Sequence, residues 1–285
     1  MSQPDDEFTT RMIGTNGVEV EVATAGPTHG APIVLLHGWP HTWELWRPVG
    51  RELARNGFRV IAPNRRGIGS GDRPRAGYDV ATLAVDVTGI LDTLAVPAAS
   101  VVGIDAGVAP AVYAALTTPE RVRRLVVMEG LVPGLPGAET FLSAGPPWWF
   151  GFHAVPGLAE TVVEGHENEY LGWFLQGPSV RNDIESAARS AFVRAHSGRD
   201  ALRAGFETYR ATGRNAELVS TAMQTRRLIV PTLALSGGVV GDATGDQLMS
   251  VADDLTGASI PGCGHIIPLE RPDELATVIA DFVDC

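Results

Sequence analysis

A strand that runs through one tight turn into a helix constrains this chain more than any other segment. The apolar run Ser100–Ile104 predicts a buried strand, and Ala106–Thr117 predicts a helix. In the turn Gly103-Ile104-Asp105-Ala106-Gly107, small residues flank Asp105 on both sides. Small neighbours permit a sharp, strained turn that projects the central side chain from the end of a sheet. A carboxylate held there can attack carbon and form an alkyl ester, although an aspartate at a strand end can also merely cap the next helix.

Short apolar strands and helical segments alternate through the first half of the chain. We predict strands at Phe8–Met12, Val18–Thr24, Ile33–Leu36, Arg59–Ala62, Ser100–Ile104 and Leu125–Met128, and helices near Val80–Leu94 and Ala106–Thr117. The alternation of valine and glutamate over Val18–Val22 is typical of an edge-type strand with one solvated face. The overall rhythm predicts a doubly wound, mostly parallel sheet with a site at the carboxyl ends of its strands.

The rhythm of strands and helices stops at the proline- and glycine-rich segment Leu131–Gly137. From there to about Thr225 the sequence favours helices, contains aromatic clusters and has no strand signal. Strands resume at Leu228–Leu235 and Ala258–Ile260. We therefore expect an α/β core formed by residues 1–132 and 226–285, with a helical cap of residues 133–225 inserted after the sixth strand.

Two further loops place reactive groups at the same edge of the predicted sheet. His37-Gly38-Trp39-Pro40 follows the third strand, and the backbone N–H groups of Trp39 and Ala106 would form an oxyanion hole. We therefore expect His37, Trp39 and Ala106 beside the substrate. In the tight loop Pro261–His265, His265 is expected to be the general base that activates water against an ester on Asp105. The remaining loop and cap histidines are expected to be mostly solvated polar groups: His41, His153, His166 and His196.

With these motifs the chain resembles the epoxide hydrolases of the α/β-hydrolase fold over nearly its whole length. The segment Asn64–Pro74 is similar to the loop after the fourth strand of that family, and Arg124–Glu129 is similar to its sixth strand. The resemblance implies that Asp105 opens an epoxide, that donors in the cap hold the epoxide oxygen, and that a histidine–acid pair hydrolyses the ester. It also implies that no cofactor takes part.

The acid that assists His265 has two candidates. Glu129 ends the sixth strand directly, and the branch of the family with an acid there has a similar Met-Glu ending. Asp242 follows the seventh strand, where many hydrolases carry the acid, but it is two residues beyond the usual position, Val240. A carboxylate at either place could orient His265 and stabilise its charged form. We favour Glu129.

The resemblance also implies which cap residues hold the epoxide oxygen. Trp149 stands where the family commonly has a histidine, and Tyr209 stands where it has a tyrosine. An indole N–H can donate a hydrogen bond but cannot give up its proton, whereas a phenol can do both, so Tyr209 is the expected acid. Trp148 and Trp149 either donate hydrogen bonds or pack between cap and core. The tryptophan pair resembles epoxide hydrolases of actinomycete aromatic polyketide pathways, which implies secondary metabolism and bulky or flat aromatic substrates.

Two other functions remain open at this point. A dehalogenase would share the Asp–His chemistry, but the fluoroacetate type needs arginines just after the nucleophile, where this chain has Ala106 and Ala109. Haloalkane enzymes usually have a tryptophan immediately after the nucleophile, again in place of Ala106. A non-catalytic hydrolase-fold protein that binds a small molecule is disfavoured because both Asp105 and His265 are present. No His, Cys and Asp residues have the spacing of metal ligands, so no metal is expected.

Composition and charge limit the binding partners and the cellular compartment that we expect for this protein. The formal net charge of −11 disfavours nucleic acid and anionic membranes, which attract basic surfaces. The acidic segment Met1–Glu7 lacks a signal-peptide pattern, no stretch resembles a membrane span, and Cys263 and Cys285 make no disulfide framework. We expect a cytoplasmic enzyme for a hydrophobic small molecule, and the sequence leaves a homodimer open.

Overall fold

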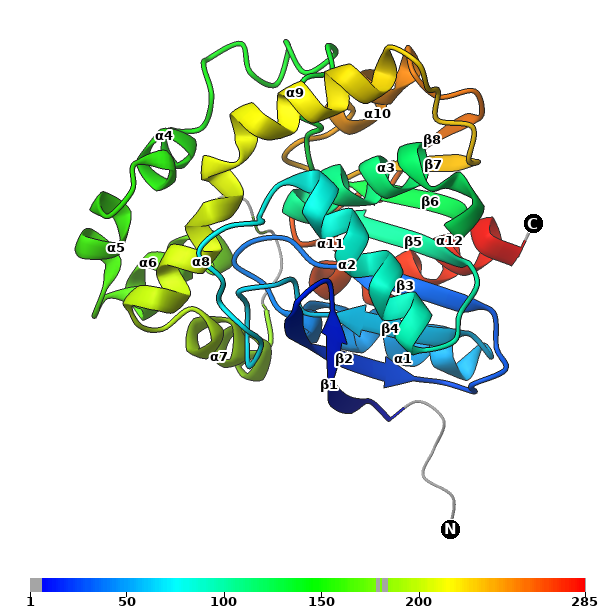
Figure 1. The fold of residues 1–285 in the computed structure, drawn as a ribbon, viewed down its shortest axis with the longest axis horizontal. Helices are drawn as coiled ribbons and strands as arrows, with labels where there is room; N and C mark the ends of the chain where they lie inside the picture. Colours follow the sequence, from blue (N-terminus) through cyan, green and yellow to red (C-terminus); the bar gives the residue numbers. More distant parts are fainter. Residues whose placement is uncertain (1–6, 178–179, 181–183, 285) are drawn as a thin grey trace.

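The computed structural model describes residues 7–177, 180 and 184–284, and it contains an eight-stranded sheet with helices around it (Figure 1). Most of the acidic start of the chain (residues 1–6) and Cys285 lie outside the described residues. The strands are β1 Thr9–Thr15, β2 Val18–Ala25, β3 Pro32–Leu36, β4 Arg59–Pro63, β5 Ala99–Ile104, β6 Val122–Met128, β7 Thr232–Ser236 and β8 Leu255–Ser259. The helices before β6 or after β7 are α1 Arg47–Arg55, α2 Val80–Thr93, α3 Val108–Thr117, α10 Ala243–Met249, α11 Ile267–Glu270 and α12 Pro272–Asp284. Short 3₁₀ helices lie at η1 Trp43–Trp46, η2 Asp105–Gly107 and η3 Pro119–Arg121.

The sheet is mostly parallel, which confirms the predicted fold class. Its strand order is β1-β2-β4-β3-β5-β6-β7-β8, with antiparallel pairing of β1 with β2 and of β2 with β4 and parallel pairing beyond. The prediction that Val18–Thr24 is an edge strand is wrong, because β1 pairs along the outer side of β2. The alternation of valine and glutamate shows only that the two faces of β2 differ in burial: Val18 and Val20 are buried while Glu19 is exposed.

Alternate residues of the parallel strands enter two separate hydrophobic clusters, one on each face of the sheet. Leu35 and Ile104 belong to the cluster that includes Leu53 of α1 and Ile279 of α12. Residues such as Val34 and Val101 belong to the other cluster, with side chains from α2 and α3. Figure 1 shows α2 and α3 in front of the sheet and α1 and α12 behind it. Because helices cover both faces, the polar groups of the strands can only gather at the strand ends.

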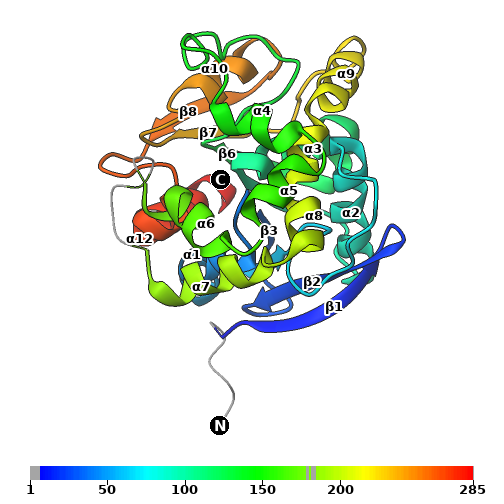
Figure 2. The same ribbon diagram turned by 90° about the vertical axis from the view of Figure 1, so that its left-hand side faces the viewer.

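A run of helices separates β6 from β7 in the chain. These helices are α4 Trp148–Ala154, α5 Leu158–Val163, α6 Glu167–Gln176, α7 Ser186–Ala195, α8 Arg199–Arg210 and α9 Thr212–Met223. Helices α4 to α8 lie together to one side of the sheet, and α9 returns from them toward the core (Figures 1 and 2). The segment from residue 129 to 147 contains turns rather than the helix we expected, since four prolines there disfavour one. In the described residues no helix is both long and apolar enough to cross a membrane.

Candidate active site

Asp105 lies at the carboxyl end of β5, where the chain turns through η2 into α3. Its φ of 53° is in the left-handed region, which costs a non-glycine residue about 1–3 kcal/mol and is tolerated where the surroundings enforce it. The neighbours must be small: a Cβ on Gly103 would lie 2.6 Å from the Gly107 carbonyl oxygen. A Cβ on Gly38 would overlap the Asp105 side chain itself. The turn therefore presents the carboxylate as the sequence predicted.

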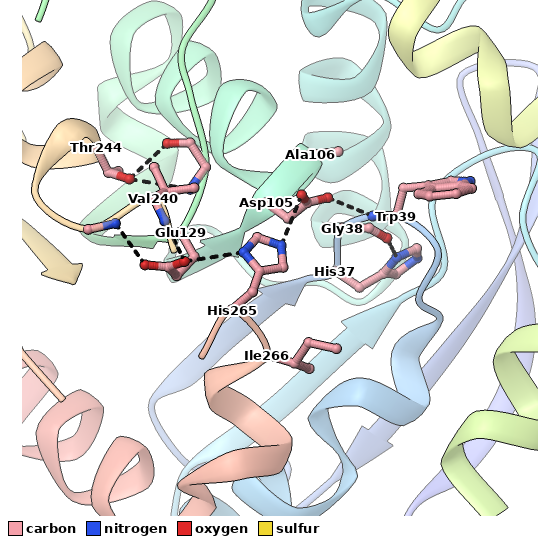
Figure 3. A network of polar contacts seen from close by, with 12 residues as sticks. His37, Gly38, Trp39, Asp105, Ala106, Glu129, Val240, Thr244, His265 and Ile266 are labelled. Carbon is pink, nitrogen blue, oxygen red and sulfur yellow. Dashed lines mark hydrogen bonds and ion pairs between the residues drawn. The ribbon is translucent and has the colours of Figure 1, made fainter. Parts of the chain in front are cut away.

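The two carboxylate oxygens of Asp105 have different surroundings (Figure 3). Oδ1 accepts a hydrogen bond from the Trp39 backbone N–H at 2.8 Å, and Oδ2 lies 3.2 Å from Nε2 of His265. Burial alone would raise the pKa of Asp105, but His265 and the backbone N–H groups of Trp39 and Ala106 lower it below the ordinary value. The group is therefore an anion at neutral pH, and the Trp39 N–H holds one of its oxygens.

His265 joins Asp105 to a second carboxylate. Its Nδ1 lies 3.2 Å from Oε2 of Glu129, which stands at the end of β6 with a φ of 47° and is completely buried. Burial alone would lower the pKa of His265, but hydrogen bonds to Asp105 and Glu129 and their charges raise it to about 10. In the free protein His265 is thus a cation that lies between the carboxyl groups of Asp105 and Glu129.

The loop after β7 surrounds Glu129 with backbone donors. The N–H groups of Gly237, Val240 and Gly241 donate to its carboxylate at 2.8, 2.9 and 3.0 Å. Asp242, the competing candidate, instead accepts a 2.6 Å hydrogen bond from the Ser236 hydroxyl. Of the two acids, the structure brings Glu129 to His265, and the seventh-strand loop that carries Asp242 serves to hold Glu129.

A cavity of about 630 Å³ opens onto Asp105. The predicted site residues that line it are Asp105, Ala106, Glu129, His265, Trp39, Trp149 and Tyr209. His37 does not: it is fully buried, accepts a 3.1 Å hydrogen bond from the Arg65 N–H, and donates to the Gly38 carbonyl at 2.7 Å. His37 thus supports the loop from behind, and the expectation that it lies beside the substrate does not match this placement.

Helices α4 and α8, which lie between β6 and β7 in the chain, contribute predicted site residues to the cavity. Tyr209, on α8, packs against Trp39 with ring centroids 5.7 Å apart, and burial and the nearby Asp105 raise its pKa well above the ordinary value. Trp149, on α4, is half-buried and makes an edge contact with Phe174 at 5.5 Å. Trp148 is 55% exposed and does not line the cavity; it packs on Trp149 from outside.

Sequence reasoning missed several residues around the cavity. Trp173, Phe174 and Phe150 add to its aromatic wall, and the only signal for them was the aromatic clustering of the cap.

The expectation of solvated histidines is wrong for three of the four. His41, His153 and His196 are at most 1% exposed, whereas His166 is exposed. Their burial comes from packing between segments far apart in the sequence, such as His153 and His196 against Trp39, which no local pattern reveals.

Burial keeps these three imidazoles neutral. It lowers the pKa of His41 and of His153 to about 3 and that of His196 to about 4. His153 also shares a 2.5 Å hydrogen bond with the Tyr170 hydroxyl and stacks on Phe206 at 4.3 Å. Within the described residues, no group of three or more His, Cys, Asp or Glu side chains could hold a metal ion.

Comparison with known proteins agrees with this architecture. Residues 31–272 match the family described as alpha/beta hydrolase fold, and the chain belongs to that family. Within it, the chain is 32% identical to the soluble epoxide hydrolase of Corynebacterium sp. (strain C12), over 93% of this chain and 94% of that protein. It is 27% identical to epoxide hydrolase A of Mycobacterium tuberculosis, over 96% and 97% of the two chains.

Solved structures of related proteins have the same fold. The structure of Cfl2 from Burkholderia cenocepacia superposes with a TM-score of 0.89 at 33% identity, covering 97% of this chain and 96% of that one. The epoxide hydrolase CorEH, solved without ligand, superposes with a TM-score of 0.87 at 30% identity, covering 98% and 99%. The resemblance expected from the motifs is therefore confirmed at full length.

Proposed function

We propose that this protein is an epoxide hydrolase that converts an epoxide to a vicinal diol through an ester on Asp105. The observation that carries the proposal is the Asp105 carboxylate, with Oδ1 on the Trp39 N–H and Oδ2 facing His265. A serine at this turn would suit acyl transfer, whereas a carboxylate suits displacement at carbon. The names of the full-length relatives support the same reaction.

The first step is ring opening. Oδ1 of Asp105 accepts the Trp39 N–H and Oδ2 faces His265, so Oδ2 attacks an epoxide carbon while Oδ1 stays on the backbone N–H. The carbon–oxygen bond of the epoxide breaks, and the released oxygen takes the proton of Tyr209. Trp149 can donate a second hydrogen bond to that oxygen from α4, since both side chains line the cavity. The products of this step are the hydroxyalkyl ester and the Tyr209 phenolate.

The second step is hydrolysis of the ester, and it requires neutral His265. Esterification removes the negative charge of Asp105, one of the groups that raise the pKa of His265 to about 10, so that pKa falls. The imidazolium then releases a proton that restores Tyr209. Neutral His265 takes a proton from water as the water attacks the ester carbon, and the N–H groups of Trp39 and Ala106 stabilise the oxyanion. Collapse breaks the bond between the ester carbon and Oδ2, and the departing alkoxide takes the proton of the new carboxyl group, which releases the diol and leaves the Asp105 anion and the His265 cation.

The cavity supports a bulky aromatic or hydrophobic substrate. Its volume of about 630 Å³ suits a molecule of drug size, and aromatic rings from α4, α6 and α8 form one wall. Within that wall, Trp149, Trp173 and Phe174 pack edge to face on one another at 4.8–5.9 Å, so a flat ring could stack on them. The residues 133–225 would act as a cap that supplies both this wall and the oxygen donors.

A product assay tests the proposed reaction. Incubation with an aryl epoxide should give the vicinal diol, and incubation with an alkyl halide should release no halide. Asp105→Ala should abolish diol formation, with a loss on the order of 10⁶-fold. Halide release without diol formation, or a few per cent of activity in Asp105→Ala, would contradict the proposal.

A further inference from the structure

Arg65 is a buried cation with no carboxylate partner among the described residues. It lies just beyond the end of β4, is 8% exposed and lines the cavity. The neighbouring Arg66, equally buried, makes an ion pair with Asp86, and Arg210 makes one with Glu160. Burying a guanidinium without a carboxylate partner is unfavourable. A buried guanidinium of this kind beside a reactive cavity is therefore a candidate for a functional role.

The two ends of the Arg65 guanidinium bind to the two sides of the cavity. Nη1 donates to the Ala106 carbonyl at 3.3 Å, and Nη2 donates to the Thr208 hydroxyl at 3.1 Å, while Nε has no partner. Ala106 directly follows Asp105 on the core turn, and Thr208 directly precedes Tyr209 on α8. A planar guanidinium has fixed angles between its N–H groups. These two hydrogen bonds therefore link the turn at Ala106 to helix α8 through one rigid group.

Attachment of α8 to the core does not explain this link. Arg203, one turn and a half earlier on the same helix, already donates to the carbonyls of Arg73 and Pro74 at 2.9 and 3.1 Å. Arg203 does not line the cavity and pairs with Asp200. The link through Arg65 differs because it ends beside the two groups that would react with an epoxide.

We propose that Arg65 is a positioning residue that sets the separation of Asp105 and Tyr209 across the cavity. This inference rests on the proposed function. In ring opening the nucleophile and the proton donor act on opposite sides of the carbon–oxygen bond that breaks, so their separation must match the epoxide. A displacement of about 1 Å can cost on the order of 10²-fold in rate. In addition, the positive charge of Arg65 stays in place while negative charge moves from Asp105 toward the epoxide oxygen.

Three variants separate this role from simple structural support. Thr208→Val removes the hydroxyl on the cap side with little change of shape. Arg65→Lys keeps the charge but loses the planar guanidinium that donates to both Ala106 and Thr208. Arg203→Lys is the matched control, because it weakens the other link between α8 and the core. Rates of ester formation and ester hydrolysis are measured separately in single turnovers of styrene oxide, by acid quench and intact mass, and thermal unfolding is recorded for each variant.

We expect Thr208→Val and Arg65→Lys each to slow ester formation about 10–100-fold while hydrolysis changes by less than about threefold. The double variant should be no slower than Arg65→Lys alone, because both changes break the same link. Arg203→Lys should form the ester at the wild-type rate. If Arg65→Lys does not fold, Thr208→Val decides alone.

Ester formation at the wild-type rate in Thr208→Val would overturn the role of Arg65, and so would equal slowing by Arg203→Lys. Equal slowing of ester formation and hydrolysis would overturn it too. A wild-type protein that forms no ester with the epoxide would overturn the proposed function along with it, so the two failures are distinguishable.

Discussion

Both acids of the site occupy backbone positions that residues other than glycine rarely adopt. Asp105 has a φ of 53° and Glu129 a φ of 47°, each just beyond the carboxyl end of a parallel strand. Backbone N–H groups hold both carboxylates, from Trp39 for Asp105 and from the loop after β7 for Glu129. Strain of this kind is retained where the surroundings over-determine it, and here it aims two carboxylates at one imidazole.

The protonation cycle of His265 predicts where its replacement stops the reaction. His265→Gln should still allow Asp105 to attack, but no base would then activate water for hydrolysis. The alkyl ester should accumulate, and the intact mass should rise by one substrate molecule. Steady turnover of this variant at the wild-type rate would exclude the role.

The assignment of the assisting acid is tested by paired amide substitutions. Glu129→Gln removes the charge beside His265 and places an NH₂ group among three N–H donors, so kcat should fall by about 10³–10⁴-fold. Asp242→Asn keeps an acceptor for the Ser236 hydroxyl and should cost far less. Circular dichroism separates misfolding from lost chemistry. A larger loss of kcat in Asp242→Asn would show that the acid comes from the seventh-strand loop.

At the scale of secondary structure, α4 and α8 bring the side chains Trp149 and Tyr209 to one cavity that is also lined by the segments that follow β3, β5 and β6. The turn after β5 could be predicted because its signal is local: small residues around Asp105 between an apolar strand and a helix. The orientation of Trp148 could not be predicted. The two tryptophans occupy adjacent helical positions about 100° apart, and the sequence does not say which of them lines the cavity; in the structure it is Trp149.

The burial of the histidines illustrates the same limit. His41 and His196 belong to segments separated by some 150 residues, and contacts across such separations leave no periodic pattern. By contrast, the mostly parallel sheet and the loops of Trp39 and His265 follow from alternation and chain order. The domain boundaries at 133 and 225 stay predictions.

The proposed donors to the epoxide oxygen can be tested by removing one hydrogen-bonding group at a time. Tyr209→Phe removes the phenolic proton with little change of shape, and loss of one such donor typically raises the barrier by about 2.7–4 kcal/mol. kcat should fall accordingly while KM changes little. Trp149→Phe should have a similar effect if the indole N–H donates, and Trp148→Phe is the matched control, since its exposed ring does not line the cavity. Unchanged kcat in Tyr209→Phe would contradict the assignment.

Across the molecule, buried neutral histidines concentrate where the helices between β6 and β7 pack on the loop after β3. Burial lowers the pKa of His37, His41, His153 and His196 in the folded state, whereas the unfolded value is near 6.5. Their contribution to stability is therefore complete above pH 6.5 and is lost as the pH falls below it, down to pH 3–4 for His41, His153 and His196. His265 has the opposite sign: its pKa of about 10 gives stability that is complete below 6.5 and is lost as the pH rises through 10.

Stability should accordingly be greatest near pH 6.5 and fall steeply in acid. Each buried histidine contributes up to about 1.4 kcal/mol per pH unit below 6.5, so the free energy of unfolding should drop by several kcal/mol between pH 7 and pH 5. Denaturant titrations at a series of pH values measure this slope. His153→Phe should reduce it, and replacement of the exposed His166 by Gln should not. A flat profile from pH 7 to 5 would contradict this account of the interface.

In the proposed mechanism, water attacks an ester on Asp105 rather than the epoxide itself. A single turnover in oxygen-18 water, with the protein in excess over an aryl epoxide, tests it directly. In the ester route the diol receives its second oxygen from Oδ2 of Asp105, and water replaces that oxygen in the carboxylate. Mass spectrometry should therefore find the label in the peptide that contains Asp105, with an unlabelled diol. A labelled diol and an unlabelled Asp105 peptide after the first turnover would contradict the mechanism.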